Sequence, residues 1–184
     1  MYDAKLSVFI ITCSGHQTLK VIRLTLLFLF ATSVIAQSYA TADEDDLPYV
    51  EIQSSRDFQA LGRQAKHENK IIFLEVSASY CGYCKTLEEH IIKPMLRSGD
   101  YDHYVLFRKI EIDSYLSIKD FDGEKTSPSQ FALKRKASLT PTLLFIDSNG
   151  QEVSERIVGV NTLELYGGYV DEALLKGHQK IQQN

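Results

Sequence analysis

The stretch IIFLEVSASYCGYC at residues 71–84 decides how this chain folds. Its first six residues, 71–76, form a short and largely apolar run of the kind that becomes a buried strand. Its last four residues place two cysteines, Cys81 and Cys84, three positions apart at the start of a predicted helix. Two thiols at this spacing can close a disulfide and open it again, so the pattern favours redox chemistry.

Cys81 is predicted to be the attacking thiol of the pair. A helix N-terminus carries partial positive charge and unpaired N–H groups. A thiolate there is stabilised, so its pKa can fall from about 8.5 to a value of about 3.5–7.5. Cys81 precedes the first turn and is expected to be the more exposed cysteine. Cys84 lies one turn later on the same side and can resolve a mixed disulfide by attacking the Cys81 sulfur.

Two further interpretations of the cysteine pair stay open. In the first, the pair is half of a zinc site, but the chain has no second Cys-x-x-Cys motif. Further zinc ligands would have to come from histidines, none of which stands at ordinary ligand spacing: His67, His90, His103 and His178. A purely structural disulfide is the second, although so short a loop would constrain little chain entropy.

Residues 1–40 predict a secretory signal peptide. Lys20 and Arg23 precede the apolar stretch 24–35, and the small residues that end at Ala40 fit a signal-peptidase site. The apolar stretch is too short to span a bilayer comfortably, which takes about 20 residues. The region before it is unusually long for a signal peptide, and an uncleaved membrane anchor is the alternative.

The charge of the mature chain argues against a nucleic-acid partner. The whole chain has 20 Lys and Arg and 24 Asp and Glu. Residues 1–40 contain three basic side chains and one acidic side chain. Residues 41–184 therefore carry 17 basic and 23 acidic side chains and a formal charge of −6. Cleavage would also remove Cys13. An exported protein with one vicinal cysteine pair is typical of a redox enzyme, not of a disulfide scaffold.

The mature chain predicts a single α/β domain at residues 54–184, preceded by an acidic linker and edge segment at 41–53. Ser127 is the predicted N-cap of one helix, with Pro128 at its first position. The alternation of predicted strands and helices along the chain implies a central mixed sheet with helices on both faces. Strands are expected at 49–52, 71–76, 105–112, 142–147 and 153–158, and helices at 56–67, at 83–96, from Ser127 and from Asn161.

Over nearly all of residues 49–176 the chain resembles the thioredoxin superfamily. Three separated features carry the resemblance: the strand–CxxC–helix, the acidic Glu75 six residues before Cys81, and Leu139-Thr140-Pro141-Thr142 with Val158-Gly159-Val160 after the hairpin. The resemblance implies a thioredoxin fold. The chain is also similar to one subgroup of this superfamily, the exported SoxW-type thioredoxins of bacterial sulfur oxidation. Three segments carry this second likeness: the lead-in to the first core strand, the segment 120–123 and the acidic CxxC helix.

The resemblance also implies roles for particular residues. Glu75 would be a buried carboxylate of raised pKa that accepts a proton from Cys84. The bond before Pro141 would be cis, so that the Thr140 backbone can run beside the disulfide and pair with an extended substrate segment. Three residues that flank the thiols are expected to shape the substrate groove: Tyr80, Gly82 and Tyr83. Thioredoxins usually carry Trp and Pro where this chain has the two tyrosines.

The function expected from these features is that of a periplasmic thiol:disulfide oxidoreductase, a monomer that reduces protein disulfides. The Cys81–Cys84 disulfide would be its only redox group, with no cofactor and no metal. A membrane protein of the DsbD/CcdA kind would restore the dithiol. Gly82-Tyr83 and Thr140 also resemble periplasmic disulfide isomerases, but the chain has no room for their dimerisation domain. Three more functions stay open: an oxidase, a copper or thiol-dependent binding module, and a catalytically silent assembly partner.

Overall fold

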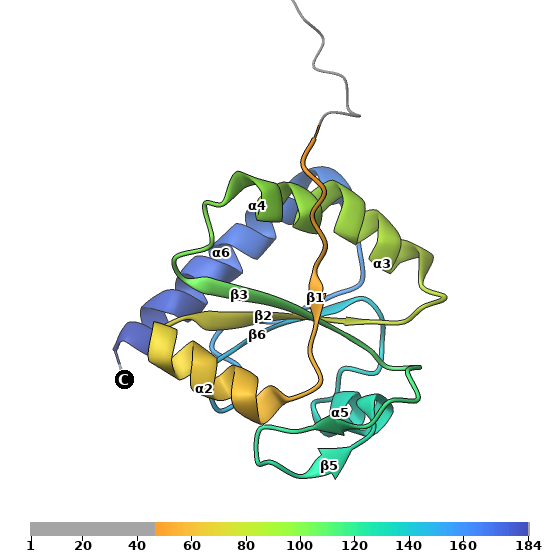
Figure 1. Cartoon of the computed structure of the whole chain (residues 1–184). Coiled ribbons are helices and arrows are strands. Elements are labelled where there is room, and N and C mark those ends of the chain that lie inside the picture. Colours follow the sequence, from red (N-terminus) through yellow and green to blue (C-terminus); the bar gives the residue numbers. More distant parts are fainter. Residues whose placement is uncertain (1–46, 184) are drawn as a thin grey trace, which may run out of the picture. The chain divides into compact units, whose positions relative to one another are not determined.

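The computed structural model describes residues 47–183 of the chain. Residues from Pro48 onward form one compact unit (Figure 1). The predicted signal peptide, Cys13 and the first part of the acidic linker lie outside the described residues. Among the helices that the structure describes, none is long and apolar enough to cross a membrane.

A five-stranded mixed sheet forms the centre of this unit, as predicted. Its strand order is β1-β3-β2-β6-β7. β1, β3 and β2 pair in parallel, whereas β6 pairs antiparallel with both β2 and β7. The strands are β1 (Gln53–Ser54), β2 (Ile71–Ser77), β3 (Val105–Glu111), β6 (Thr142–Ile146) and β7 (Ile157–Val158).

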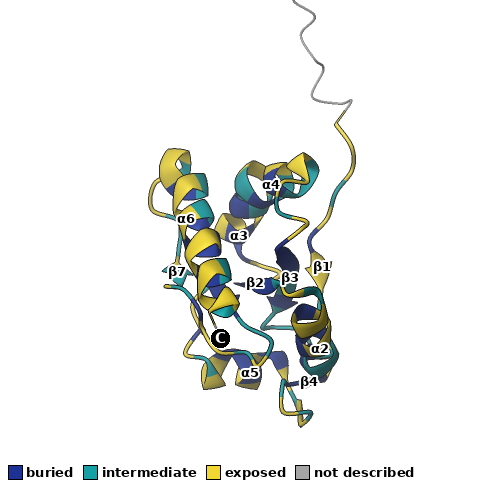
Figure 2. Cartoon of the chain, turned by 90° about the vertical axis from the view of Figure 1, so that its left-hand side faces the viewer, coloured by how far each residue is buried: buried dark blue, intermediate teal, exposed yellow. Residues whose placement is uncertain are grey.

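Helices cover both faces of the sheet (Figure 1). One face packs against α2 (Phe58–Glu68) and α5 (Pro128–Lys134). The other packs against α6 (Leu163–Gln182) and a long helix that follows the cysteines, made of α3 (Gly82–Leu87), the π-helical η3 (Glu88–Ile92) and α4 (Lys93–Ser98). Figure 2 shows that each helix turns its buried side to the sheet and its exposed side to solvent. The α/β thioredoxin architecture expected from the sequence is therefore confirmed.

β2 is buried on both faces because helices lie above and below it. Successive side chains of a strand point to opposite faces. Ile72, Leu74 and Val76 belong to the core beside α2 and α5, whereas Ile71 and Phe73 belong to the core beside α3 and α6. This is why the run 71–76 is almost uniformly apolar and does not alternate with polar residues. The same alternation sends the side chain of Glu75 into the layer of α3 and α6.

The helix after the cysteines bends at its proline and does not end there. Proline has no N–H to donate and crowds the carbonyl four residues earlier. Here the chain widens into the π-helical turn η3, in which the Lys93 N–H bonds to the Glu88 carbonyl, and Pro94 falls in the first turn of α4. The helix then continues to Ser98, where Gly99 ends it in the left-handed conformation (φ 70°).

The polar segment 113–126 contains a two-stranded ribbon, β4 (Ile118–Lys119) and β5 (Lys125–Thr126), that was not predicted. Asp120 in the ribbon is buried and accepts hydrogen bonds from Arg135 Nη2 (2.6 Å) and Lys134 Nζ (3.0 Å). The Arg135 guanidinium also lies over the Phe131 ring, 3.6 Å from its centroid. These charged and stacked contacts fasten the ribbon to α5.

Two boundaries near the start of the domain were wrong. The edge strand expected at 49–52 forms instead as β1, where Ser54 pairs with Lys109. Because Ser54 is used in the sheet, the following helix begins later than predicted. Its N-cap is Asp57, whose Oδ1 accepts from the Ala60 N–H at 2.8 Å. The predicted cap of α5 is confirmed, since Ser127 Oγ accepts from the Gln130 N–H at 3.2 Å.

Two boundaries near the C-terminal end also differ. The strand expected at 153–158 pairs regularly only at Ile157–Val158. Residues 154–156 leave the ladder, and Arg156 Nη1 donates to the Lys136 carbonyl at 2.9 Å. The N-cap of α6 is Thr162, not Asn161. Thr162 is the last residue with an extended backbone (φ −130°) before the helix begins at Leu163.

Candidate active site

Cys81 and Cys84 are joined by a disulfide with a Cα–Cα distance of 5.3 Å. Cys81 is the N-cap residue of α3, and its Sγ accepts from the Cys84 N–H at 3.1 Å. Cys81 is 8% exposed and Cys84 is 1% exposed, so the first sulfur is the more accessible, as predicted. The N–H groups of the first helical turn therefore point at the sulfur that is expected to carry negative charge.

Hydrogen bonds and apolar packing hold the loop before Cys81 in place. The Cys81 N–H donates to the Ala78 carbonyl at 3.0 Å, which closes a turn after β2. The side chain of Ile112, just after β3, packs against the small core cluster formed by Ala78, Cys81 and Cys84. The carboxylate of Asp113 then accepts from the Ser79 N–H at 3.0 Å and from the Ser79 hydroxyl. The end of β3 thus supports the reactive loop from one side.

Glu75 lies in the core on the same side of the sheet as α3. The residue is fully buried, and neither of its carboxylate oxygens has a hydrogen-bond partner. Burial, and after it the Glu88 carboxylate, raise the pKa of Glu75 from 4.5 to about 8. The nearby Lys109 ammonium opposes this rise. The buried acidic residue expected from the sequence is present, and its pKa lies close to neutral pH.

Lys109 and Glu88 form a charged pair beside Glu75 that was not predicted. Glu75 and Lys109 are partners in the parallel register of β2 and β3. Lys109 Nζ donates to Glu88 Oε1 at 3.0 Å, and both side chains are mostly buried. Burial by itself would lower the pKa of Lys109, but the Glu88 hydrogen bond and the surrounding carboxylates outweigh it and raise that pKa. Lys109 is therefore a cation that pairs with Glu88 at 3.0 Å and lies 3.9 Å from the carboxylate of Glu111.

The Thr140–Pro141 peptide bond is cis, as the resemblance implied. Pairing of Val76 with Thr142 places this bond at the same end of the sheet as the reactive loop. The Pro141 carbonyl accepts from the Gly159 N–H at 2.8 Å, and Thr142 Oγ1 donates to the Leu139 carbonyl at 2.7 Å. Thr140 is half-buried and forms no hydrogen bond with another residue of the described part of the chain.

The residues expected to shape a substrate groove lie on the surface around the disulfide. Tyr80 is 76% exposed and Tyr83 is 68% exposed. Gly82 is exposed, and a Cβ built on it would meet nothing within 4 Å. Their contribution to substrate binding stays a prediction, because the geometry fixes only their location.

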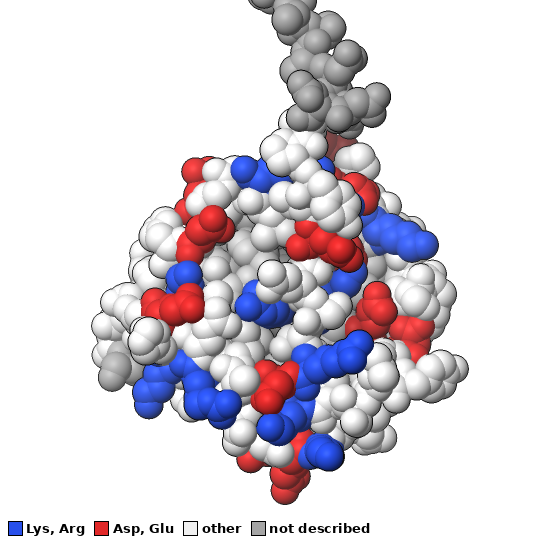
Figure 3. Space-filling view, in the orientation of Figure 1, with Lys and Arg blue, Asp and Glu red and all other residues white. Residues whose placement is uncertain are grey.

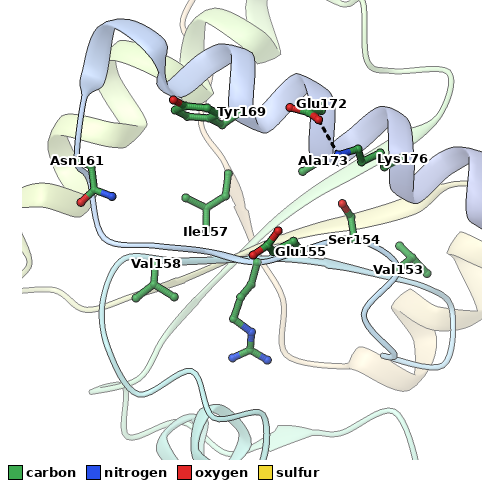
Figure 4. A pocket seen from close by; sticks show the side chains of 11 residues that line it. Val153, Ser154, Glu155, Ile157, Val158, Asn161, Tyr169, Glu172, Ala173 and Lys176 are labelled. Atoms are coloured by element: carbon green, nitrogen blue, oxygen red, sulfur yellow. Dashed lines mark hydrogen bonds and ion pairs between the residues drawn. The ribbon is translucent and has the colours of Figure 1, made fainter.

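A cleft of about 500 Å³ opens between α6 and the chain around β7, but neither cysteine lines it (Figure 4). Its walls carry a mixture of charged and apolar side chains, including Tyr169 and the Glu172–Lys176 ion pair. Within residues 47–183, no group of three or more His, Cys, Asp and Glu side chains could hold a metal ion.

Three contributors to the site could not be read from the sequence: Lys109, Glu88 and Asp113. The one available signal for Lys109 was its place in a strand that begins with the apolar residues 105–107. Its partner Glu88 lies 21 positions away, and Asp113 lies 34 positions from Ser79. Only the pairing of strands and helices shows that these residues meet. Figure 3 shows how acidic and basic side chains intersperse over one face of the molecule, without a large patch of either sign.

The chain is similar to known thioredoxins. A family model described as a thioredoxin-like domain matches residues 58–173. Thioredoxin H8 of Arabidopsis thaliana is 28% identical over 116 residues, which cover 63% of this chain and 66% of that protein. Thioredoxin H7 of the same plant is 24% identical over 63% of this chain and 75% of its own length. Among solved structures, a poplar thioredoxin h matches with 25% identity and a TM-score of 0.45, over 62% of this chain and 86% of its own.

These relatives are plant thioredoxins, so the finer likeness to exported SoxW-type proteins stays a prediction. The family match itself extends from α2 into α6 and includes the disulfide, the buried Glu75 and the cis-proline. Because it covers more than half of the sequence, this chain belongs to the family of thioredoxin-like domains.

Proposed function

We propose that this protein is a thiol:disulfide oxidoreductase that reduces disulfides in other proteins through Cys81 and Cys84. One observation carries the proposal: the cysteine pair is closed as a disulfide at a helix N-terminus, in the same core layer as a buried carboxyl group without a hydrogen-bond partner. This combination supplies an activated nucleophile, a resolving thiol and a proton acceptor.

The first step forms a mixed disulfide. In the reduced protein, the Cys81 thiolate attacks one sulfur of the target disulfide. A bond forms between Cys81 and that sulfur, the target bond breaks, and the second target sulfur leaves as a thiolate. Cys81 is suited to this step because it is the more exposed cysteine and accepts the N–H of Cys84.

The second step releases the target. The Cys84 thiol loses its proton and attacks the Cys81 sulfur, which forms the internal disulfide and frees the first target sulfur as a thiolate. We assign the acceptance of that proton to Glu75, because its pKa of about 8 allows exchange near neutral pH. The target gains two electrons, which a donor must return to the Cys81–Cys84 disulfide before the next turnover.

We also propose where the protein works. The charge and apolar pattern of residues 1–40 supports export to the periplasm, and a monomer there would need a membrane electron donor of the DsbD/CcdA kind. Fusion of residues 1–40 to alkaline phosphatase tests export, because the enzyme is active only after transfer to an oxidising compartment. An inactive fusion would oppose a periplasmic location without affecting the proposed chemistry.

The chemistry is tested by reduction of insulin disulfides with the full chain. Cys81→Ser should abolish the reaction, and Cys84→Ser should accumulate the mixed disulfide. Cys13→Ser is the matched control, since it changes the third cysteine, which lies outside the motif, and should leave the rate unchanged. Wild-type activity in the Cys81→Ser protein would refute the proposal.

The reduction potential of the cysteine pair separates a reductase from an oxidase. A value close to that of thioredoxins, about −270 mV, supports a reductase, whereas one close to about −120 mV indicates an oxidant. Refolding of a scrambled disulfide protein tests for isomerase activity. Stoichiometric binding of Cu(I) without any disulfide exchange would instead support a copper carrier.

A further inference from the structure

The Lys109 ammonium lies in the field of two buried carboxylates, Glu75 and Glu88, but it pairs with only one of them. Its Nζ lies 3.0 Å from Glu88 Oε1 and 3.3 Å from Glu88 Oε2. Glu75 is its register partner on β2, and neighbouring strands lie about 4.8 Å apart. Even so, Glu75 forms no ion pair or hydrogen bond with Lys109 in the described part of the chain. The lysine is therefore held by the helix and not by the strand beside it.

The position of Glu88 on the helix follows from the position of Cys84. The Glu88 N–H donates to the Cys84 carbonyl, so the two residues are one turn apart. Residues four apart lie on the same helix face, and Cys84 is on the buried face. This is why the side chain of Glu88 keeps only 15% of its exposure. A carboxylate at such a place needs a cation, and Lys109 supplies it.

The titratable side chains that face Glu75 come from the helix after the cysteines, from β3 and from α6: Glu88, Lys109, Glu111 and Tyr166. Of these, Lys109 is the cation. Glu111 lies 3.9 Å from the ammonium but is 42% exposed, so water screens that pair. The Tyr166 hydroxyl already donates to the Gly159 carbonyl at 2.9 Å. The ionisation of Glu75 therefore depends on where the Lys109 ammonium is held.

The place of the ammonium decides how strong a base Glu75 is. With Lys109 held by Glu88, the pKa of Glu75 is about 8, which is close to the value of about 8.5 for a free thiol. A carboxylate that pairs with a neighbouring cation instead has its pKa lowered by about 1–3. Proton transfer is most effective when the pKa of the acceptor lies near the working pH. A Glu75 carboxylate paired with Lys109 would therefore be a weaker acceptor for the proton of Cys84.

We propose that Glu88 is a positioning residue for the step that releases the target: it holds the Lys109 ammonium and so leaves Glu75 unpaired and able to take the proton of Cys84. This inference rests on the proposed function, in which Cys84 loses its proton before it attacks. The proton moves from Cys84 Sγ to an oxygen of the ionised Glu75 carboxylate. The Cys84 sulfur then bonds to the Cys81 sulfur, and the target sulfur leaves as a thiolate. Glu88 and Lys109 keep their charges throughout.

The first experiment titrates Glu75 directly in the full-length oxidised protein. Glutamate that is isotopically labelled at its side-chain carboxyl carbon gives NMR signals for these groups, and Glu75→Gln identifies the signal of Glu75. Glu88→Gln keeps the size of the side chain, removes its charge and frees Lys109. It should lower the pKa of Glu75 by about 1–3, which is an ionisation constant about 10- to 1000-fold larger. Glu89→Gln is the matched control, because it removes the neighbouring, exposed glutamate that pairs with Lys93, and it should leave the titration unchanged.

Two further variants separate the position of Lys109 from the charge of Glu88, since that charge by itself also raises the pKa of Glu75. Lys109→Gln and Glu88→Gln/Lys109→Gln are titrated in the same way, and the dispersion of their spectra shows whether they are folded. If Glu88 acts through Lys109, its removal should change the pKa of Glu75 much less in the Lys109→Gln protein than in the wild type. An equal change in both would mean that Glu88 acts by its charge alone, which would overturn the inference.

The rate of target release links the titration to the reaction. The reduced protein is mixed with a nitrobenzoate disulfide, which yields one coloured thiolate when Cys81 attacks and a second when Cys84 resolves the mixed disulfide. These measurements use proteins that also carry Cys13→Ser, so that only the motif reacts. The second release is followed by stopped-flow absorbance across the pH range. In Glu88→Gln, the midpoint of its pH profile should move to lower pH together with the pKa of Glu75.

Each failure has a distinct meaning. If Glu88→Gln leaves the titration of Glu75 unchanged, Glu88 does not control Glu75, and the inference is wrong while the proposed function stands. If the titration moves but the pH profile of release does not, Glu75 does not take the proton of Cys84, which also overturns the inference. If the wild-type protein releases no second thiolate, the proposed function itself fails, whatever the titration shows.

Discussion

Replacing Glu75 with Gln should stabilise the oxidised protein in alkaline solution. The substitution keeps the size and shape of the side chain but removes the group that can ionise. Glu75 is fully buried without a hydrogen-bond partner, so its ionised form is strongly disfavoured in the folded state. The neutral acid and the neutral amide should cost about the same to bury. The two proteins should therefore differ only where ionisation matters.

The sign and size of the effect follow from the pKa of Glu75 in the two states. That pKa is 4.5 for the ordinary group and about 8 in the folded protein. Below pH 4.5 both states bind the proton, and the full stability is present. Between pH 4.5 and 8 the unfolded chain releases the proton while the folded protein keeps it, so the wild type loses about 1.4 kcal/mol for each pH unit. Above pH 8 the accumulated loss, and hence the advantage of Glu75→Gln, is about 5 kcal/mol.

Equilibrium unfolding by guanidinium chloride from pH 4 to 9 measures this difference. The chain has no tryptophan, so far-UV circular dichroism is the suitable probe. Glu172→Gln is the control, because Glu172 is exposed on α6 and this variant should follow the pH dependence of the wild type. Parallel profiles for Glu75→Gln and wild type between pH 4.5 and 8 would refute the reasoning. The same variant should release mixed disulfides more slowly, since Cys84 would lack its proton acceptor.

Three further predictions concern the packing of the domain. Asp120→Asn removes the charged partner of the mostly buried Arg135 and should lower the free energy of unfolding by about 3–5 kcal/mol. Asp122→Asn changes a more exposed carboxylate of the same ribbon and should have a much smaller effect in the same unfolding assay. Gly62→Ala would bring a Cβ to 2.3 Å from the Ser148 carbonyl oxygen and should destabilise the protein by about 1–3 kcal/mol, because the clash is with backbone. Gly168→Ala in α6 meets nothing within 4 Å and should instead stabilise it by about 0.5–1 kcal/mol; equal thermal shifts for the two alanine variants would contradict this explanation.

The sequence by itself determined the parts of this protein that depend on neighbouring residues. The apolar run 71–76 defined β2, and the cysteine spacing placed a disulfide at the first turn of the next helix. Ser127 was a recognisable helix cap because its partner, the Gln130 N–H, is three residues away. The burial of Glu75 and the cis bond before Pro141 followed from the family resemblance, which compares patterns over most of the domain.

The tertiary structure alone decided which distant residues surround the disulfide. Lys109 meets Glu75 through the register of β2 and β3, and it meets Glu88 because the helix after the cysteines packs across that sheet. Asp113 reaches Ser79 only once β3 has paired with β2. Such contacts depend on strand register and helix packing, which are set by the burial of the whole core and not by local sequence.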